Sequence, residues 1–297
     1  MTPGASARAL RIATRGSALA LAQTEIVVSL LRAVHVQTEV AVVHSSGDRA
    51  ADMPAALMEG QGWFTAELEQ AVLDGRADAA VHSAKDLPTE LANGLTVVAY
   101  LARADARDAL VTRDGAGLQG LRSGATVGTS SPRREAFLRA LRPDVRAVPM
   151  RGNVDTRLRK LDEGEVDALL LAAAGVDRLG RGDRISERLD PHRFVPAPAQ
   201  GVIAVEAWVE STAAGACAPL DDPVSRAAVR AEREVLRRLG AGCRLPLGAW
   251  ARVEEGRLVL VGALAAADGS VSTVEMAGDL SDPRGLGALV AARLGAA

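Results

Sequence analysis

The sequence predicts an α/β protein with two similar α/β domains around a cleft and a hinge, and a small C-terminal α+β domain. Three observations lead to this fold class. Short apolar runs typical of buried strands alternate with longer helical patterns over residues 10–207, as in sheets built from βαβ units. A helix end, a glycine turn and an apolar strand begun by aspartate occur twice, at residues 73–79 and 161–168, which indicates a duplicated plan. From residue 247 onward the pattern changes to three alternating strands and a closing helix.

The first expected domain comprises residues 8–102 and 198–212. A strand leads through a glycine turn into a helix over 18–34, for which Ser17 is the expected N-cap. Residues 49–62 have no clear period and contain two glycines, so we expect a loop that serves as a lid. The last strand is expected to return from the second domain, which would create two crossings and hence a hinge. Strands are expected at 10–13, 40–44, 77–82, 95–101 and 202–207, with a helix at 65–73.

The second expected domain comprises residues 103–197. One of its helices begins at residues 130–134, where a serine cap is followed by a proline. Arg133 and Arg134 then lie at a helix N-terminus, where their charges oppose the helix dipole. This arrangement is costly unless an anion lies there, so it points to a function. Strands are expected at 108–112, 125–129, 145–149 and 166–171. A helix that ends at about residue 163 and another over 172–179 are also expected.

The third expected domain comprises residues 218–297. We expect a linker over residues 213–222, then an amphipathic helix over 223–239. Cys243 follows this helix, behind Gly242 and before a proline. By itself this local pattern favours a buried structural thiol over a presented, reactive one. Strands are expected at 247–253, 258–264 and 271–276, with a final helix over 283–294.

Composition excludes several classes of function. The 297-residue chain is 48% hydrophobic and carries a formal charge of −2, so no overall field draws it to nucleic acid or an anionic membrane. Aromatic residues make up only 2% of the chain, which argues against stacking on single-stranded nucleic acid. No run approaches a membrane span, no export signal is evident, and the cysteines and histidines lack metal-ligand spacing. We therefore expect a cytoplasmic protein without a metal site that binds neither nucleic acid nor membrane.

Arginines gather at the expected strand-to-helix turns. A guanidinium group binds a carboxylate through two parallel hydrogen bonds, so several such arginines imply a ligand with many carboxylates. Phosphates would satisfy the same groups, but the chain has no Walker loop and no Gly-x-Gly-x-x-Gly motif. The arginines at these turns are Arg15, Arg133, Arg134, Arg151, Arg157 and Arg178.

Five motifs resemble those of the porphobilinogen deaminase family, also called hydroxymethylbilane synthases, in family order over nearly the whole chain. They lie at residues 11–17, 80–88, 127–134, 151–158 and 242–243. The resemblance implies a transferase of tetrapyrrole and heme biosynthesis. It would condense four porphobilinogen molecules head to tail, with loss of ammonia, and release linear hydroxymethylbilane by hydrolysis. The growing product would be anchored on a dipyrromethane cofactor attached covalently to Cys243.

The resemblance also implies roles for single residues. Asp86 would be catalytic, because a carboxylate aimed at the pyrrole nitrogens stabilises the positive charge that develops there and assists proton transfer. The motif by itself favours a strand-end carboxylate paired with Lys85. The cofactor would be held by Cys243, Lys85, Asp86, Ser131, Arg133, Arg134 and Arg178. The substrate would be held by Arg15, Ser17, Gln23, Arg151, Arg157 and Gln200.

The chain departs from the family pattern at three places. Leu57 and Gln61 stand in the expected lid where members often carry lysines, which predicts a lid with altered electrostatics. Residues 199–201 read Ala-Gln-Gly where many members read Gly-Gln-Gly. Asp155 stands where a small or neutral residue is common.

The main alternative is a bilobal carboxylate-binding protein without catalysis. Two periplasmic-binding-protein-like α/β domains around a hinge are the plan of such proteins as well. A binding protein would use the arginines to hold its ligand, but it would need neither Cys243 nor the third domain. The family resemblance instead implies a monomer whose substrate is porphobilinogen and whose product passes to uroporphyrinogen-III synthase.

Overall fold

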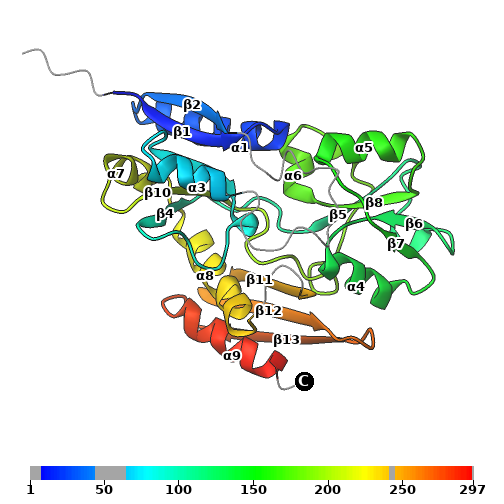
Figure 1. The fold of residues 1–297 in the computed structure, drawn as a ribbon. Helices are drawn as coiled ribbons and strands as arrows, with labels where there is room; N and C mark the ends of the chain where they lie inside the picture. Colours follow the sequence, from blue (N-terminus) through cyan, green and yellow to red (C-terminus); the bar gives the residue numbers. More distant parts are fainter. Residues whose placement is uncertain (1–7, 44–64, 241–244, 296–297) are drawn as a thin grey trace, which may run out of the picture.

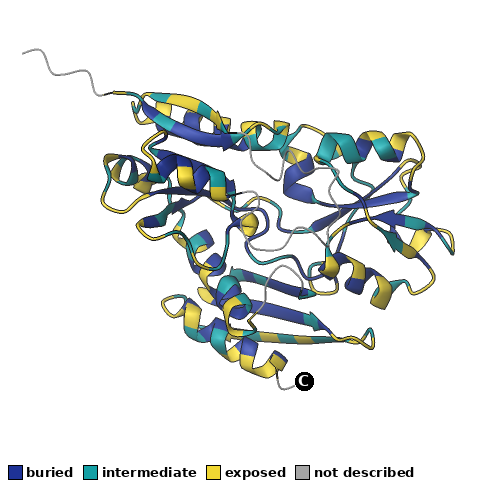
Figure 2. Cartoon of the chain, viewed as in Figure 1, coloured by how far each residue is buried: buried dark blue, intermediate teal, exposed yellow. Residues whose placement is uncertain are grey.

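The computed structural model describes residues 8–43, 65–240 and 245–295, and these contain three β-sheets (Figure 1). The two larger sheets have five strands each, and the third has three. We call the first sheet with its helices the first lobe, the second sheet with its helices the second lobe, and the third sheet with its helices the C-terminal unit. The central strands of both large sheets are buried, whereas the helices expose one side (Figure 2).

The first lobe has strand order β2-β1-β3-β10-β4. Strands β1, β2 and β3 are parallel, and β10 is antiparallel to both β3 and β4. Helix α1 begins at the expected cap, since the Ser17 hydroxyl accepts a hydrogen bond from the Ala20 amide. The elements are β1 (Leu10–Arg15), α1 (Ala18–Ala33), β2 (Thr38–Val43), α3 (Ala66–Leu73), β3 (Ala79–Ser83), β4 (Leu95–Tyr100), β10 (Ile203–Trp208) and α7 (Thr212–Cys217).

The second lobe repeats this arrangement with strand order β7-β6-β8-β5-β9. Its first three strands are again parallel, and β5 is antiparallel to both neighbours. The repeated segments at 73–79 and 161–168 lead into β3 and β8, which occupy the same position in the two sheets, so the predicted duplication is confirmed. The elements are β5 (Asp108–Thr112), β6 (Thr126–Gly128), α4 (Pro132–Leu141), β7 (Arg146–Val148), α5 (Val154–Asp162), β8 (Ala168–Ala172), α6 (Ala173–Arg178) and β9 (Glu187–Arg188).

The C-terminal unit is an antiparallel sheet whose two faces have different partners. Val261 and Ala263 of the central strand pack into the core of the second lobe beside Phe137, whereas Leu258 and Leu260 face the helices of the unit. The elements are α8 (Pro223–Arg238), β11 (Leu247–Glu254), β12 (Arg257–Ala265), β13 (Val271–Gly278) and α9 (Pro283–Gly295). Short 3₁₀ turns are η2 (Ala84–Asp86), η3 (Leu118–Gly120), η4 (Gly182–Arg184) and η5 (Ala218–Leu220).

The chain crosses between the lobes twice, through residues 101–107 and 189–202. The crossings are hydrogen-bonded to each other, since the Ala104 amide donates to the Gly201 carbonyl at 3.1 Å. Gly201 has a φ of +87°, and a Cβ there would lie 2.8 Å from the Ala104 oxygen, so this position requires glycine. Ala199 also has a positive φ, of 64°, where an alanine is disfavoured. The Ala-Gln-Gly departure therefore lies within the second crossing.

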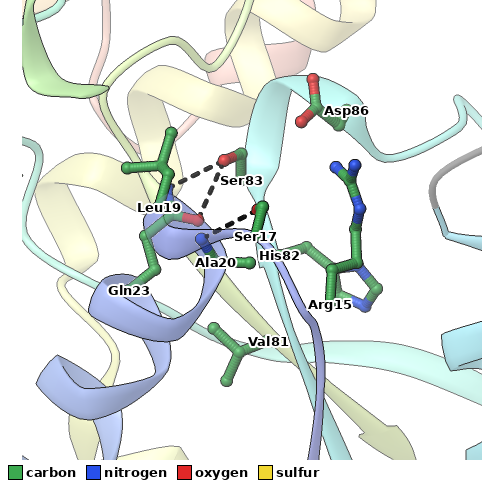
Figure 3. Close-up of a pocket in the computed structure, with 9 residues that line it drawn as sticks. All are labelled: Arg15, Ser17, Leu19, Ala20, Gln23, Val81, His82, Ser83 and Asp86. Carbon is green, nitrogen blue, oxygen red and sulfur yellow. Dashed lines mark hydrogen bonds between the residues drawn. The ribbon is translucent and has the colours of Figure 1, made fainter. Parts of the chain in front are cut away.

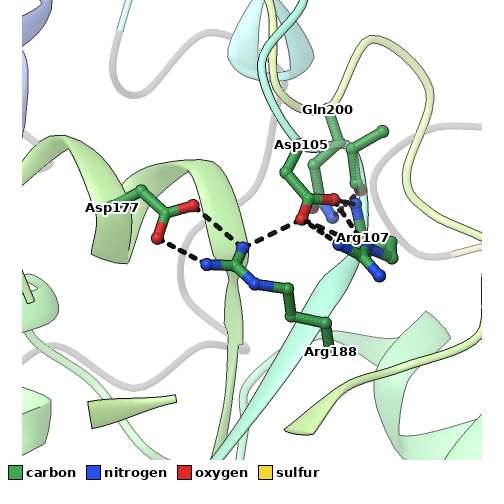
Figure 4. A network of polar contacts seen from close by, with 6 residues as sticks. Asp105, Arg107, Asp177, Arg188 and Gln200 are labelled. Carbon is green, nitrogen blue, oxygen red and sulfur yellow. Dashed lines mark hydrogen bonds and ion pairs between the residues drawn. The ribbon is translucent and has the colours of Figure 1, made fainter. Parts of the chain in front are cut away.

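Side chains reinforce the hinge formed by these crossings (Figure 4). Asp105 of the first crossing accepts hydrogen bonds from Arg107 Nε and from Arg188 Nη1, both at 2.9 Å. Arg188 also binds Asp177 at the end of α6, with 2.7 Å between Nη2 and Oδ1. The first crossing is thereby tied to the second lobe.

A buried carboxylate on α8 joins the hinge to the C-terminal unit. Glu232 accepts two hydrogen bonds from the guanidinium of Arg103, at 2.7 and 2.9 Å. It also accepts from the backbone amide of Ala199 at 2.6 Å and from that of Ala251 at 2.7 Å. Both crossings and strand β11 therefore converge on one side chain, and α8 is fixed relative to the hinge.

The structure corrects the expected linker over residues 213–222. This segment contains α7, which Ser211 caps by accepting from the Ala214 amide, and η5. Ala213 and Cys217 are buried in the core of the first lobe. The prediction was wrong because small residues lack a strong helical pattern, although they pack closely against a sheet. In the described ranges, no helix combines the length and apolar character needed to cross a membrane.

Candidate active site

The expected site residues follow the carboxyl ends of parallel strands in both lobes. Strand β1 leads into Arg15 and Ser17, and β3 leads into η2, which carries Lys85 and Asp86. Open α/β sheets bind ligands at this end of their strands. In the second lobe, the residues that follow β6, β7 and β8 are Ser131, Arg151 and Arg178.

In the first lobe these strand ends enclose a cavity of about 70 Å³ (Figure 3). Arg15 and Asp86 have their side chains on the same side of this space. The Gln23 amide donates to the Ser83 hydroxyl at 2.8 Å, which fixes the wall contributed by α1. The polar side chains that line the cavity are those of Arg15, Ser17, Gln23, His82, Ser83 and Asp86.

The residues of the turn η2 differ in their burial. Ala84 is buried with Leu87 in a cluster that includes Val229 of α8, and its amide donates to the Val202 carbonyl at 3.0 Å. Lys85 and Asp86, in contrast, keep their side chains accessible to water. The apolar residues therefore hold the turn in place, and the two charged groups remain available to a ligand.

The charge around Lys85 comes from both lobes. The surrounding protein partly desolvates its ammonium group and lowers the pKa to about 8; Arg134 and Arg133 of the second lobe lower it further, while Asp86 and Asp108 oppose them. Since Lys85 still contacts water, solvent screens part of this effect. A ligand carboxylate at Lys85 would stabilise the charged form.

We expect Lys85 to lose its proton near pH 8 when the site holds no carboxylate. Raising the pH through this value should weaken anion binding, because the neutral amine no longer attracts a carboxylate. Reductive ¹³C-methylation followed by NMR would measure the titration in the Cys243→Ser variant. Lys160 is the only other lysine, so an added Lys85→Arg change assigns the signal. A Lys85 signal that stays constant over about two pH units around 8 would contradict the prediction.

Arginines also follow the strand ends of the second lobe. Arg157, in the first turns of α5, donates through Nε to the Gly152 carbonyl at 2.8 Å. Burial lowers its pKa to about 10, with further contributions from the charges of Arg134 and Arg151. A carboxylate bound at Arg157 would favour the charged form of this guanidinium group.

Arg133 and Arg134 have an anionic partner within the protein itself. Arg133 Nη1 lies 2.7 Å from Asp108 Oδ2, and Arg134 Nε lies 2.8 Å from Asp108 Oδ1. All three residues are buried. Arg133 also donates to the Val195 carbonyl and Arg134 to the Leu170 carbonyl. The anion expected near the start of α4 is therefore supplied by Asp108, and the binding of the cofactor by these two arginines stays a prediction.

Gln200 and Arg178 lie at the hinge. Gln200 is 1% exposed, and its amide donates to the Ala106 carbonyl at 2.8 Å and to Asp108 at 3.3 Å. Arg178 donates to the Gly201 carbonyl at 2.7 Å, and burial lowers its pKa. The structure thus places Gln200 in the hinge and not in the cavity with Gln23. Its binding of substrate stays a prediction.

A buried pair beneath the cavity escaped the sequence analysis. His82 Nε2 lies 3.0 Å from Glu206 Oε2, and both side chains are almost completely buried. Glu69 lies nearby, and its pKa is raised first by burial and then by the charge of Glu206. The signal available in the sequence was a glutamate in the middle of the apolar strand at 202–207. Cys243, Leu57 and Gln61 lie outside the described residues, as does the expected lid at 49–62.

The fold and the site together define a bilobal α/β protein with cationic side chains after the strand ends of both lobes and a small C-terminal unit. Comparison with known families gives a closer assignment. Residues 10–215 match the model "Porphobilinogen deaminase, dipyromethane cofactor binding domain", and residues 226–296 match "Porphobilinogen deaminase, C-terminal domain". The chain belongs to the porphobilinogen deaminase family. It is an enzyme, a hydroxymethylbilane synthase with a dipyrromethane cofactor.

Curated relatives agree with this assignment. The porphobilinogen deaminase of Roseiflexus castenholzii is 48% identical over 96% of this chain and 95% of its own length. That of Thiobacillus denitrificans is 47% identical over 96% and 94%. Among solved structures, the periplasmic VFT2 domain of BvgS from Bordetella pertussis is similar at 18% identity and a TM-score of 0.43, over 71% of this chain and 86% of that one. The alternative of a binding protein is not favoured, because the family models also include the C-terminal unit.

Proposed function

We propose that condensation of porphobilinogen takes place at the site around Asp86, with the dipyrromethane cofactor attached to Cys243. The observation that carries this proposal is the cavity at the strand ends of the first lobe, where Asp86 lines the same space as Arg15, Ser17 and Gln23. Burial lowers the pKa of both Lys85 and Arg157, so a bound acetate or propionate would favour their charged forms. The residues present therefore fit the cofactor and the substrate. When bound, the cofactor supplies the free pyrrole α-carbon to which each unit is added.

In this proposal the protein contributes charge and proton transfer. Asp86, at the end of η2, faces the cavity and stabilises positive charge on the pyrrole nitrogens. It also assists the proton transfers that accompany the loss of ammonia and rearomatisation. Cofactor carboxylates are held by Lys85, Ser131, Arg133, Arg134 and Arg178. The incoming substrate is held by Arg15, Ser17, Gln23, Arg151, Arg157 and Gln200.

The proposal also includes the compartment, the oligomeric state, the partners and the domain bounds of the protein. The family resemblance supports a cytoplasmic monomer that takes porphobilinogen as substrate and passes its product to uroporphyrinogen-III synthase. The proposed domains are residues 8–102 with 198–212, residues 103–197 and residues 218–297. The strand orders support the first two of these, because β10 pairs with β3 and β4.

The test is the Asp86→Asn variant, followed by intact mass spectrometry under denaturing conditions. We expect a folded protein whose ladder of added pyrrole units forms about a hundredfold more slowly, because the carboxylate charge is lost where positive charge develops. Asp74→Asn serves as a matched control, since Asp74 is an exposed residue at the C-terminal end of α3. A ladder of normal rate in Asp86→Asn would remove Asp86 from the mechanism.

A further inference from the structure

Helix α8 presents one face to the first lobe. Arg226, Val229 and Arg233 are spaced so that they share this face. Val229 packs with Ala84 of the turn η2 and with Leu87, which follows it. The helix that leads toward Cys243 is therefore in direct contact with the segment that carries Asp86.

Arg233 binds the exit of this turn. Its Nη1 donates to the Leu87 carbonyl at 3.1 Å, and its Nη2 donates to the Pro88 carbonyl. Leu87 precedes a proline and is extended, with φ −67° and ψ 138°, so it does not continue the helical turn begun at Ala84. Burial lowers the pKa of Arg233, which shows that its guanidinium group is partly removed from water. Hydrogen bonds from such a group are stronger than those of an exposed one.

We propose that Arg233 is a positioning residue for Asp86. The entrance of the turn is held by the end of the second crossing, through the Ala84 amide and the Val202 carbonyl, and the exit is held by Arg233. Fixing both ends sets the direction of the carboxylate between them. In the sequence, Cys243 follows Arg233 by ten residues. This inference rests on the proposed role of Asp86.

The experiment compares Arg233→Met with Arg226→Met in the holoenzyme. Arg226 is a matched control, since it lies on the same face of α8 and donates to the carbonyls of Val97 and Val98 on β4, away from the turn. We expect Arg233→Met to lower kcat by about tenfold or more, while KM stays within about twofold, because a misdirected carboxylate slows the chemistry without removing a substrate contact. Arg226→Met should leave kcat unchanged.

Hydrogen–deuterium exchange supplies a readout that does not depend on turnover. Amides of residues 84–90 should exchange faster in Arg233→Met than in the parent or in Arg226→Met. Arg233→Lys retains a donor, so it should recover part of both kcat and protection; it also tests the proposal if the methionine variant fails to fold. An equal loss of kcat in the two methionine variants, or faster exchange with normal kcat, would overturn the proposal. Normal turnover in Asp86→Asn would instead refute the role of Asp86. The exchange data would still test whether Arg233 holds the turn in place.

Discussion

Replacing Asp108 with asparagine is expected to lower the free energy of unfolding by about 3–5 kcal/mol. Asp108 is completely buried and binds the guanidinium groups of both Arg133 and Arg134. An asparagine would leave these two buried cations without a counter-charge. Urea denaturation of Asp108→Asn would measure the loss.

The same carboxylate predicts a dependence of stability on pH. Burial alone would raise the pKa of Asp108, but the two guanidinium groups overcome this and hold it at about 2, below the ordinary 3.8. Because the pKa of Asp108 is lower in the folded protein than in the unfolded chain, the charged carboxylate stabilises the fold at pH values above 3.8. This contribution is lost as the pH falls from 3.8 toward 2. Asp108→Asn should lack this contribution. Asp162→Asn is the control, since its pair with Arg184 is exposed and should change stability by less than about 1 kcal/mol.

Replacing Cys243 with serine is expected to abolish covalent attachment of the cofactor completely. The family assignment includes a dipyrromethane cofactor, and a serine hydroxyl lacks the nucleophilicity of a thiolate. Intact mass spectrometry under denaturing conditions should show the parent chain with a surplus of two linked pyrrole units. The Cys243→Ser chain should have the mass calculated from its sequence, before and after incubation with porphobilinogen.

Cys217 provides the matched control for this experiment. It is the other cysteine of the chain, it is 0% exposed in the core of the first lobe, and burial raises the pKa of its thiol to about 11. A buried thiol of this kind is unreactive. Cys217→Ala should therefore keep the full surplus mass. A surplus that persists in Cys243→Ser but disappears in Cys217→Ala would reverse the assignment of the anchor.

Local signals in the sequence were sufficient for most of the secondary structure. The strand at 108–112 has the predicted bounds, and the helices after Ser17 and Ser131 begin at the predicted caps. These features depend on neighbouring residues, namely a side-chain oxygen that accepts from an amide three positions later. The ends of other elements differ by one or two residues, because fraying and tertiary packing determine them.

The partners of charged residues could not be predicted, because they come from distant parts of the chain. Asp108 meets Arg133 and Arg134 only after β5 takes its place beside β8. Glu206 reaches His82 because β10 returns to the first lobe. Sequence motifs identified residues suited to carboxylate chemistry. The fold decides which of them face water and which form ion pairs with other residues of the protein.

The order of strands also constrains how the chain folds during synthesis. In the first sheet β10 lies between β3 and β4, yet residues 108–188, which contain every strand of the second sheet, are synthesised before it. All five strands of the second sheet are therefore synthesised while β3 and β4 still lack the strand that joins them. Unpaired strand edges are prone to aggregation, so the first sheet is exposed to this risk until β10 is made. A chain interrupted before residue 203 would contain the described strands of the second sheet but would lack β10 of the first.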